Sequence, residues 1–199
     1  MRIAVMASHE GTTLQAVLDA VIEGRLSATV TIVISNNRES GALRRARAAG
    51  VPAVHLSSAT HPEQGHLDQA VLQALTNAEV DLVLLAGYLK RLGPRVLNHY
   101  SGRIINTHPA LLPKYGGQGM YGDRVYEAVL AEGDVETGVS VHLVDAEYDT
   151  GRVLAQCRVP VLPGDSVAAL AARVQAREKE FVVEVLEELA VAMSHVDAG

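Results

Sequence analysis

Cysteine and aromatic residues are scarce in this sequence, which has one cysteine, Cys157, one phenylalanine and no tryptophan. A single cysteine cannot form a disulfide within the chain, and it cannot supply a cysteine-based zinc site or an iron–sulfur cluster. No apolar run reaches the ~18 residues of a membrane-spanning helix, and the apolar part of the first segment is too short for a secretion signal. The sequence therefore predicts a soluble, cytoplasmic protein that makes no membrane contact.

Basic residues are also in short supply. Lysine and arginine number 17 against 23 aspartate and glutamate residues, which gives a formal net charge of −6. A surface that coats nucleic acid needs clustered lysine and arginine to neutralise phosphates. We therefore expect small-molecule substrates and no nucleic acid partner. As a separate expectation, the chain acts as a monomer or a homodimer.

Several catalytic motifs are missing as well. The sequence has no HExxH zinc motif, no GxSxG nucleophile elbow and no cysteine in a reactive context. The sequence therefore lacks these signatures of a zinc peptidase, a serine hydrolase and a cysteine nucleophile.

What the sequence does contain is a regular alternation of short apolar runs with helical patterns. The predicted strands are 2–7, 28–35, 52–56, 80–88, 103–106, 136–145 and 152–161. The predicted helices are 12–24, 40–50, 66–78, 93–99, 121–133 and 164–189, with Asp165 or Ser166 as the N-cap of the last. This order predicts one α/β domain over residues 1–199, with a doubly wound, mostly parallel twisted sheet of about seven strands and helices on both faces.

Four segments follow predicted strands directly, namely 8–13, 87–92, 106–118 and 144–151. In doubly wound sheets, ligands bind at the carboxyl ends of the strands, near the point where the strand order reverses. We therefore expect these four segments to form the functional site.

Asn106 and His108 end the fifth predicted strand, two residues apart. Side chains at this spacing lie on the same side of an extended chain. An amide donor beside an imidazole suits the polarisation of a carbonyl and the movement of a proton. Pro109 favours an extended conformation at His108. The spacing alone leaves an alternative open, in which Asn106 caps a turn and His108 is an ordinary loop histidine.

The turn DAEYDTG, residues 145–151, follows a strand and carries several carboxylates. Asp149 precedes Thr150 and Gly151, a turn that can direct its carboxylate back across the end of the sheet. A carboxylate near His108 raises the pKa of the imidazole and favours its charged form. The alternative is a solvated acidic turn.

Gly11, Thr12 and Thr13 occupy a strand-to-helix turn. Free backbone N–H groups at a helix N-terminus bind anions, and two hydroxyls add donors. An ordinary N-cap is equally compatible with this pattern.

The segment KYGGQGMYG, residues 114–122, has four glycines in nine residues. This composition is typical of a mobile lid or of a backbone that approaches a ligand closely. A plain connecting loop is the alternative.

Three stretches taken together resemble a known family: ASHEGTTLQA (7–16), NTHPALLPKY (106–115) and ETGVSVHLVDAEYDTGRVLAQ (136–156). They are similar to the phosphoribosylglycinamide formyltransferases, within the folate-dependent formyltransferase group. The resemblance extends from about residue 2 to 190, and its central Asn-x-His-Pro-Ala/Ser-Leu-Leu-Pro motif is highly specific.

The resemblance implies transfer of the formyl group of 10-formyltetrahydrofolate to the amine of 5′-phosphoribosylglycinamide, in purine biosynthesis. It implies no metal and no covalent enzyme adduct. Asn106 would hydrogen-bond the oxyanion of the tetrahedral intermediate. His108, as imidazolium, would stabilise that oxyanion and shuttle a proton. Asp149 would keep His108 charged and help to move the proton of the amine.

The resemblance also implies binding residues. For the ribonucleotide these are Gly11, Thr12, Thr13, Pro109, Gln175 and Glu178. For the folate they are Leu89, Lys90, Arg91 and Leu92, together with Asn106 and Asp149.

Six features depart from the family pattern. Thr13 replaces a frequent asparagine, and His9 and Glu10 replace the usual small or amide residues. An acidic side chain beside a phosphate is unfavourable unless it points away. Lys90 stands where arginine is frequent, and Gln64 stands where some members carry a basic residue. The lid 114–122 differs from the proline-glycine-leucine-histidine run of many relatives.

Other functions remain to be weighed against this one. Methionyl-tRNA formyltransferases add a C-terminal tRNA-binding domain and formyltetrahydrofolate hydrolases an N-terminal regulatory domain, so the length of this chain favours neither. A formyltransferase for a sugar amine is a further alternative, against which the anion-type turn at 11–13 counts mildly. A non-catalytic folate- or nucleotide-binding module would be expected to lack Asn106, His108 or Asp149, and all three are present.

Overall fold

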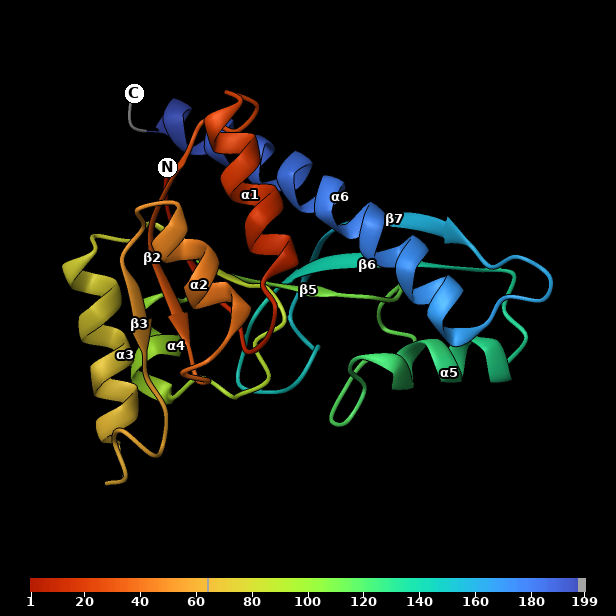
Figure 1. Ribbon diagram of the computed structural model, residues 1–199, viewed down its shortest axis with the longest axis horizontal. Helices are drawn as coiled ribbons and strands as arrows, with labels where there is room; N and C mark the ends of the chain where they lie inside the picture. The colour runs from red at the N-terminus through yellow and green to blue at the C-terminus, as the bar shows by residue number, and fades with distance from the viewer. Residues whose placement is uncertain (64, 197–199) are drawn as a thin grey trace.

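The computed structural model describes residues 1–63 and 65–196 (Figure 1). Gln64, one of the departures from the family pattern, lies outside the described residues. None of the helices in the described part of the chain is long and apolar enough to cross a membrane.

Within the described residues, seven strands form one sheet in the order β3-β2-β1-β4-β5-β6-β7. Their bounds are β1 Arg2–Met6, β2 Thr29–Ser35, β3 Ala53–His55, β4 Leu82–Leu85, β5 Ile104–His108, β6 Glu136–Leu143 and β7 Val153–Pro160. Strands β1 to β5 pair in parallel, whereas β6 runs antiparallel to both β5 and β7. The predicted α/β class and the mostly parallel sheet are confirmed.

Helices cover both faces of this sheet (Figure 1). Their bounds are α1 Thr12–Ile22, α2 Gly41–Ala48, α3 His66–Asn77, α4 Pro94–His99, α5 Asp123–Ala131 and α6 Val167–Val196. Buried side chains of α1, α2, α5 and α6 pack on one face, and those of α3 and α4 pack on the other. We call these the α6 face and the α4 face.

The alternation of side chains along each strand divides the core between the two faces. In β1, Ile3 and Val5 pack on the α6 face, while Ala4 and Met6 pack on the α4 face. Both faces of the central strands are therefore apolar, which explains why these strands read as continuous hydrophobic runs.

The longest helix, α6, begins as the sequence predicts. The Ser166 hydroxyl accepts a hydrogen bond from the backbone N–H of Ala169 at 3.2 Å, which makes Ser166 the N-cap. Arg173 donates to the Asp165 carboxylate and holds its pKa at about 2. From this start α6 packs on α5, β6, β7 and α1 (Figure 1).

The antiparallel direction of β6 corrects one step of the sequence argument. Segments 8–13, 87–92 and 106–118 do leave the carboxyl ends of the parallel strands β1, β4 and β5. The fourth segment, 144–151, instead leaves β6 beside the start of β5, where the Val144 N–H donates to the carbonyl of Ile104. Segment 144–151 lies with the other three segments because the chain folds back after β6. The rule that ligands bind at the carboxyl ends of parallel strands does not account for its position.

Candidate active site

Four polar side chains meet beside the α4 face of β5. Asn106 and His108 come from β5, His142 from the paired position on β6, and Asp149 from the turn that follows β6. The Asp149 carboxylate lies 3.5 Å from His108 Nδ1 and 3.4 Å from His142 Nε2. The structure thus brings together the three residues that the sequence singled out, and it adds His142.

His108 is held between two acceptors. Its ring is 4% exposed, and Nε2 donates to the backbone carbonyl of Tyr115 at 2.7 Å, while Nδ1 faces Asp149. Burial lowers the pKa of His108 below its ordinary value, although the Asp149 charge and the Tyr115 carbonyl act in the opposite direction. The Asp149 carboxylate thus acts in the expected direction, but desolvation of the imidazolium outweighs it, so the net shift of the His108 pKa is downward.

Asp149 is fixed by its backbone and by its hydrogen bonds. It adopts a left-handed conformation with φ of 57°, and its carboxylate accepts the Gly117 N–H at 2.9 Å. Burial by itself raises the pKa of Asp149, but the neighbouring His142 ring, the charge of His108 and the Gly117 N–H together hold it below its usual range. Asp149 is therefore a stable anion beside His108.

His142 connects Asn106 to this anion. The Asn106 amide donates to His142 Nε2 at 3.0 Å, and His142 Nδ1 contacts the Leu143 carbonyl at 2.8 Å. In the sequence, His142 is only one member of an alternating strand pattern. Its position follows from the antiparallel register that pairs it with Asn106, and neither residue's local sequence contains that information.

The proline-bounded loop after His108 is tied to β6. The buried Ser140 hydroxyl donates to the Ala110 carbonyl at 2.6 Å and accepts from the Leu112 N–H at 3.0 Å. Pro109 is half-buried and lies in the chain between His108 and the residues that contact Ser140. The loop therefore fixes the end of β5.

The first part of the glycine-rich segment 114–122 contacts the site through its backbone. Tyr115 supplies its carbonyl to His108 and Gly117 its N–H to Asp149. A Cβ at Gly116 would lie 2.5 Å from Leu112 Cδ2 and 3.3 Å from Asp149 Cβ. The glycines thus permit a close approach to the site residues themselves.

A cleft on the α4 face adjoins these groups. Its apolar lining includes Leu85, Tyr88, Leu92, Leu97 and Val144, and Asn106, His142 and Asp149 lie at its polar end. Burial raises the pKa of Tyr88 to about 12.

The predicted folate segment borders this cleft. Lys90, Arg91 and Leu92 line it, while Leu89 is exposed beside them. Arg91 donates to the Ala146 carbonyl and lies over the Tyr148 ring, 5.3 Å from its centroid. The turn 145–149 is thereby held against segment 87–92.

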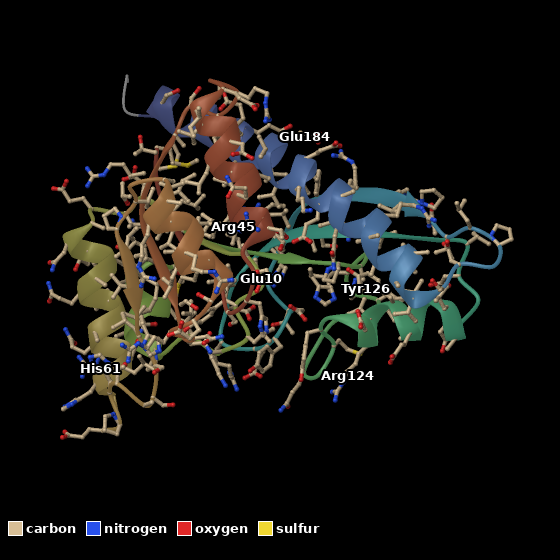
Figure 2. All side chains as sticks on the ribbon, in the orientation of Figure 1. Glu10, Arg45, His61, Arg124, Tyr126 and Glu184 are labelled. Carbon is tan, nitrogen blue, oxygen red and sulfur yellow. The ribbon has the colours of Figure 1, made fainter. Side chains whose placement is uncertain are left out.

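The α6 face carries a second set of predicted residues. Thr107 points away from Asn106 and His108, and its hydroxyl donates to Glu178 at 2.6 Å. Burial raises the pKa of Glu178. Gln175, one turn earlier on α6, hydrogen-bonds the buried Tyr126 of α5, whose place against α6 is visible in Figure 2.

The turn at Gly11–Thr13 begins α1, which packs on the same face. Gly11 is the N-cap residue with φ of 67°, and no side chain caps the helix. A Cβ at Gly11 would lie 2.7 Å from Ala42 Cα. Only glycine combines this conformation with this close approach.

A cluster of potential metal ligands is not found here. Among residues 1–63 and 65–196, no group of three or more histidine, cysteine, aspartate or glutamate side chains is placed to hold a metal ion.

Comparison with known protein families shows to which family the chain belongs. Residues 1–186 match the formyl transferase family. The chain belongs to this family.

Named formyl transferases resemble the chain over most of its length. It is 40% identical over 189 residues to the phosphoribosylglycinamide formyltransferase of Mycobacterium tuberculosis strain H37Rv. This match covers 95% of this chain and 85% of the relative. It is also 40% identical over 188 residues to the chloroplastic phosphoribosylglycinamide formyltransferase of Vigna unguiculata. That match covers 94% of this chain, but the chain spans only 60% of the length of the plant protein.

The fold agrees with that of a solved formyl transferase. The crystal structure of glycinamide ribonucleotide transformylase 1 from Symbiobacterium toebii superposes with a TM-score of 0.89 at 38% identity. The superposition covers 96% of this chain and 88% of that one.

One departure from the formyl transferase pattern is accounted for by helix α2. The Glu10 carboxylate lies 3.5 Å from Arg44, and Arg45 donates to the Glu10 carbonyl at 2.8 Å. Figure 2 shows Glu10 and Arg45 together near the start of α1. The acidic side chain is therefore paired with a cation of α2, which offsets its charge near the Gly11–Thr13 turn.

Proposed function

We propose that this chain transfers the formyl group of 10-formyltetrahydrofolate to the amine of 5′-phosphoribosylglycinamide, in purine biosynthesis. The observation that carries the proposal is the cluster of Asn106, His108 and Asp149 beside an apolar cleft at the end of β5. The names of its relatives support the choice of substrates.

The two substrates would approach β5 from its two faces. On the α4 face, the cleft offers an apolar slot of the kind that accepts a flat heterocycle, with segment 89–92 along one side. On the α6 face, the free N–H groups of α1 at Gly11–Thr13 would bind the phosphate, and Gln175 and Glu178 would bind the glycinamide portion. Pro109 would border the same substrate where the two faces meet.

Asn106 would stabilise the developing oxyanion. One N–H of its amide donates to His142, and the other is free to donate to the formyl oxygen. A preorganised donor of this kind needs little reorganisation as charge develops on that oxygen. His142 is thus assigned to hold Asn106 in place.

His108 and Asp149 would handle the protons. Nε2 of His108 is engaged by Tyr115, so Nδ1 is the nitrogen that can exchange a proton beside Asp149. When protonated, His108 adds a positive charge next to the oxyanion and can donate to the folate nitrogen that leaves. Asp149, an anion at neutral pH, would favour that form and accept the proton of the amine.

The formyl folate enters this scheme as a co-substrate, and the proposed steps use no metal ion. We include in the proposal a single catalytic domain over residues 1–199, small-molecule substrates only, and a cytoplasmic location. The continuous sheet and the acidic composition support these choices.

The decisive experiment follows the deformylation of a 10-formyl folate by absorbance, with and without phosphoribosylglycinamide and with chelator present. Turnover that requires the ribonucleotide supports the proposal. Turnover without it would indicate a hydrolase, and turnover only with a sugar amine would indicate a sister formyltransferase. Either result, or none with any acceptor, would overturn the proposal.

A further inference from the structure

A tight polar cluster surrounds the side chain of Tyr115, the residue whose carbonyl contacts His108. Asp134 follows α5 in the chain, and its two carboxylate oxygens accept from Lys114 Nζ at 2.7 Å each. The Tyr115 hydroxyl donates to the same carboxylate at 2.7 Å, and Lys114 Nζ lies 4.9 Å from the centre of the Tyr115 ring. We call these three residues the Asp134 anchor.

The anchor holds Tyr115 in an unusual conformation. Tyr115 has φ of 58°, in the left-handed region that bulky side chains rarely adopt. Such a conformation persists where surrounding contacts enforce it, and such positions cluster at functional sites. Here the Tyr115 side chain contacts Asp134 and Lys114 and also packs against the core of the α6 face.

This conformation directs the Tyr115 carbonyl at His108. The carbonyl accepts from Nε2 at 2.7 Å, so Nε2 carries a proton in the neutral as well as the charged ring. Nδ1 is left to gain or lose the second proton beside Asp149. A second histidine, His142, is the other titratable group that faces His108.

We propose that Asp134 is a positioning residue for His108. By holding Lys114 and the Tyr115 hydroxyl, it fixes the Tyr115 carbonyl and thereby selects the tautomer that presents Nδ1 to Asp149 and the reacting groups. Its carboxylate is anchored on the exposed side of the loop and does not touch the catalytic cluster.

The expected effect of Asp134 on catalysis rests on the proposed function. The selection of the His108 tautomer by Asp134 does not. Nitrogen NMR of the histidine rings distinguishes a protonated Nε2 from a protonated Nδ1, and the signal of His108 is assigned from the spectrum of His108→Gln. This readout is independent of any turnover. A wild-type chain inactive with every substrate would refute the proposed function and leave the tautomer measurement intact.

Two variants test the anchor. Asp134→Asn weakens the contacts of residue 134 with Lys114 and with the Tyr115 hydroxyl. Tyr115→Phe removes only the hydroxyl and keeps the ring and the loop length. Asp165→Asn is the matched control, because Asp165 is also paired with a cation, Arg173, at the start of α6. Chemical denaturation of all three separates loss of stability from loss of positioning.

In both anchor variants we expect the neutral His108 ring to populate the two tautomers and its pKa to fall, since the Tyr115 carbonyl favours the charged form. The kcat should fall about tenfold, the scale of one lost hydrogen bond, with KM for both substrates nearly unchanged. Asp165→Asn should lower stability only. An unchanged His108 tautomer and pH profile in folded Tyr115→Phe would overturn the proposal.

Discussion

Replacing Asp149 by asparagine is the most direct test of the site, because the change keeps the size of the side chain and removes its charge. In the wild type the Asp149 carboxylate lies 3.5 Å from His108 Nδ1, and both side chains are nearly enclosed. Two opposite unit charges at this distance interact by roughly 4–5 kcal/mol at an effective dielectric constant of about 20. The new amide can also donate to Nδ1, which stabilises the neutral ring further.

The expected loss follows from this energy. Each 1.4 kcal/mol is about a tenfold change in the population of the imidazolium, so kcat should fall by about 10³- to 10⁴-fold near neutral pH. Burial already places the pKa of His108 below its ordinary value, and the Asp149 charge opposes that effect. Without the charge, the pKa of His108 falls further, and the rate that depends on the charged ring should decline at a lower pH than in the wild type.

The assay measures kcat between pH 5 and pH 9 with both substrates saturating. Turnover is monitored through the absorbance of the deformylated folate. Asp81→Asn is the control, because Asp81 is also partly buried but binds the Arg2 N–H at the opposite end of the sheet. It should leave the profile unmoved. A basic limb at the wild-type position in Asp149→Asn would refute the coupling of Asp149 to His108.

Three further changes test other parts of the structure. His108→Ala should lower kcat by at least about 10²-fold, and near-normal turnover would contradict its role. Thr107→Val removes the hydrogen bond that counteracts burial of Glu178, so the pKa of Glu178 should rise further and kcat/KM for the ribonucleotide should fall about tenfold, most at low pH. An equal loss for the folate would contradict this assignment. In Gly138→Ala the new Cβ would lie 2.0 Å from the carbonyl of Cys157, so the free energy of unfolding should drop by about 1–3 kcal/mol, and an unchanged thermal midpoint would contradict the packing.

The elements of the fold could be predicted because each has a local signal. The periodic apolar positions of α1 and the run of apolar residues in β4 specify their own type. Ser166 marks the start of α6 by the chemistry of its hydroxyl. The direction of β6 has no such signal, because α5 precedes β6 just as a helix precedes β2, β3, β4 and β5. Only the pairing of β6 with β5 shows that it is reversed.

The candidate site could be predicted in part for the same reason. The spacing of Asn106 and His108 places them on one face, and the structure brings Asp149 to them. The alternation along β5 also places Thr107 on the other face, but its partner Glu178 lies on a helix far along the chain. The net direction of the His108 pKa depends on how completely the ring is enclosed, and burial of that kind is a property of the folded molecule alone.

The loop after Pro113 touches the catalytic cluster only with main-chain atoms, a carbonyl at Tyr115 and an N–H at Gly117. Every amino acid carries a carbonyl, and all but proline carry an N–H, so these two contacts depend on the path of the chain. The side chains of Lys114 and Tyr115 and the glycine at position 116 maintain that path. Members of this family could therefore differ in sequence beyond Gly117 and keep the same active centre. For an engineer, the residues beyond Gly117 are accordingly a region where substrate preference can be altered while the atoms that hold His108 and Asp149 stay in place.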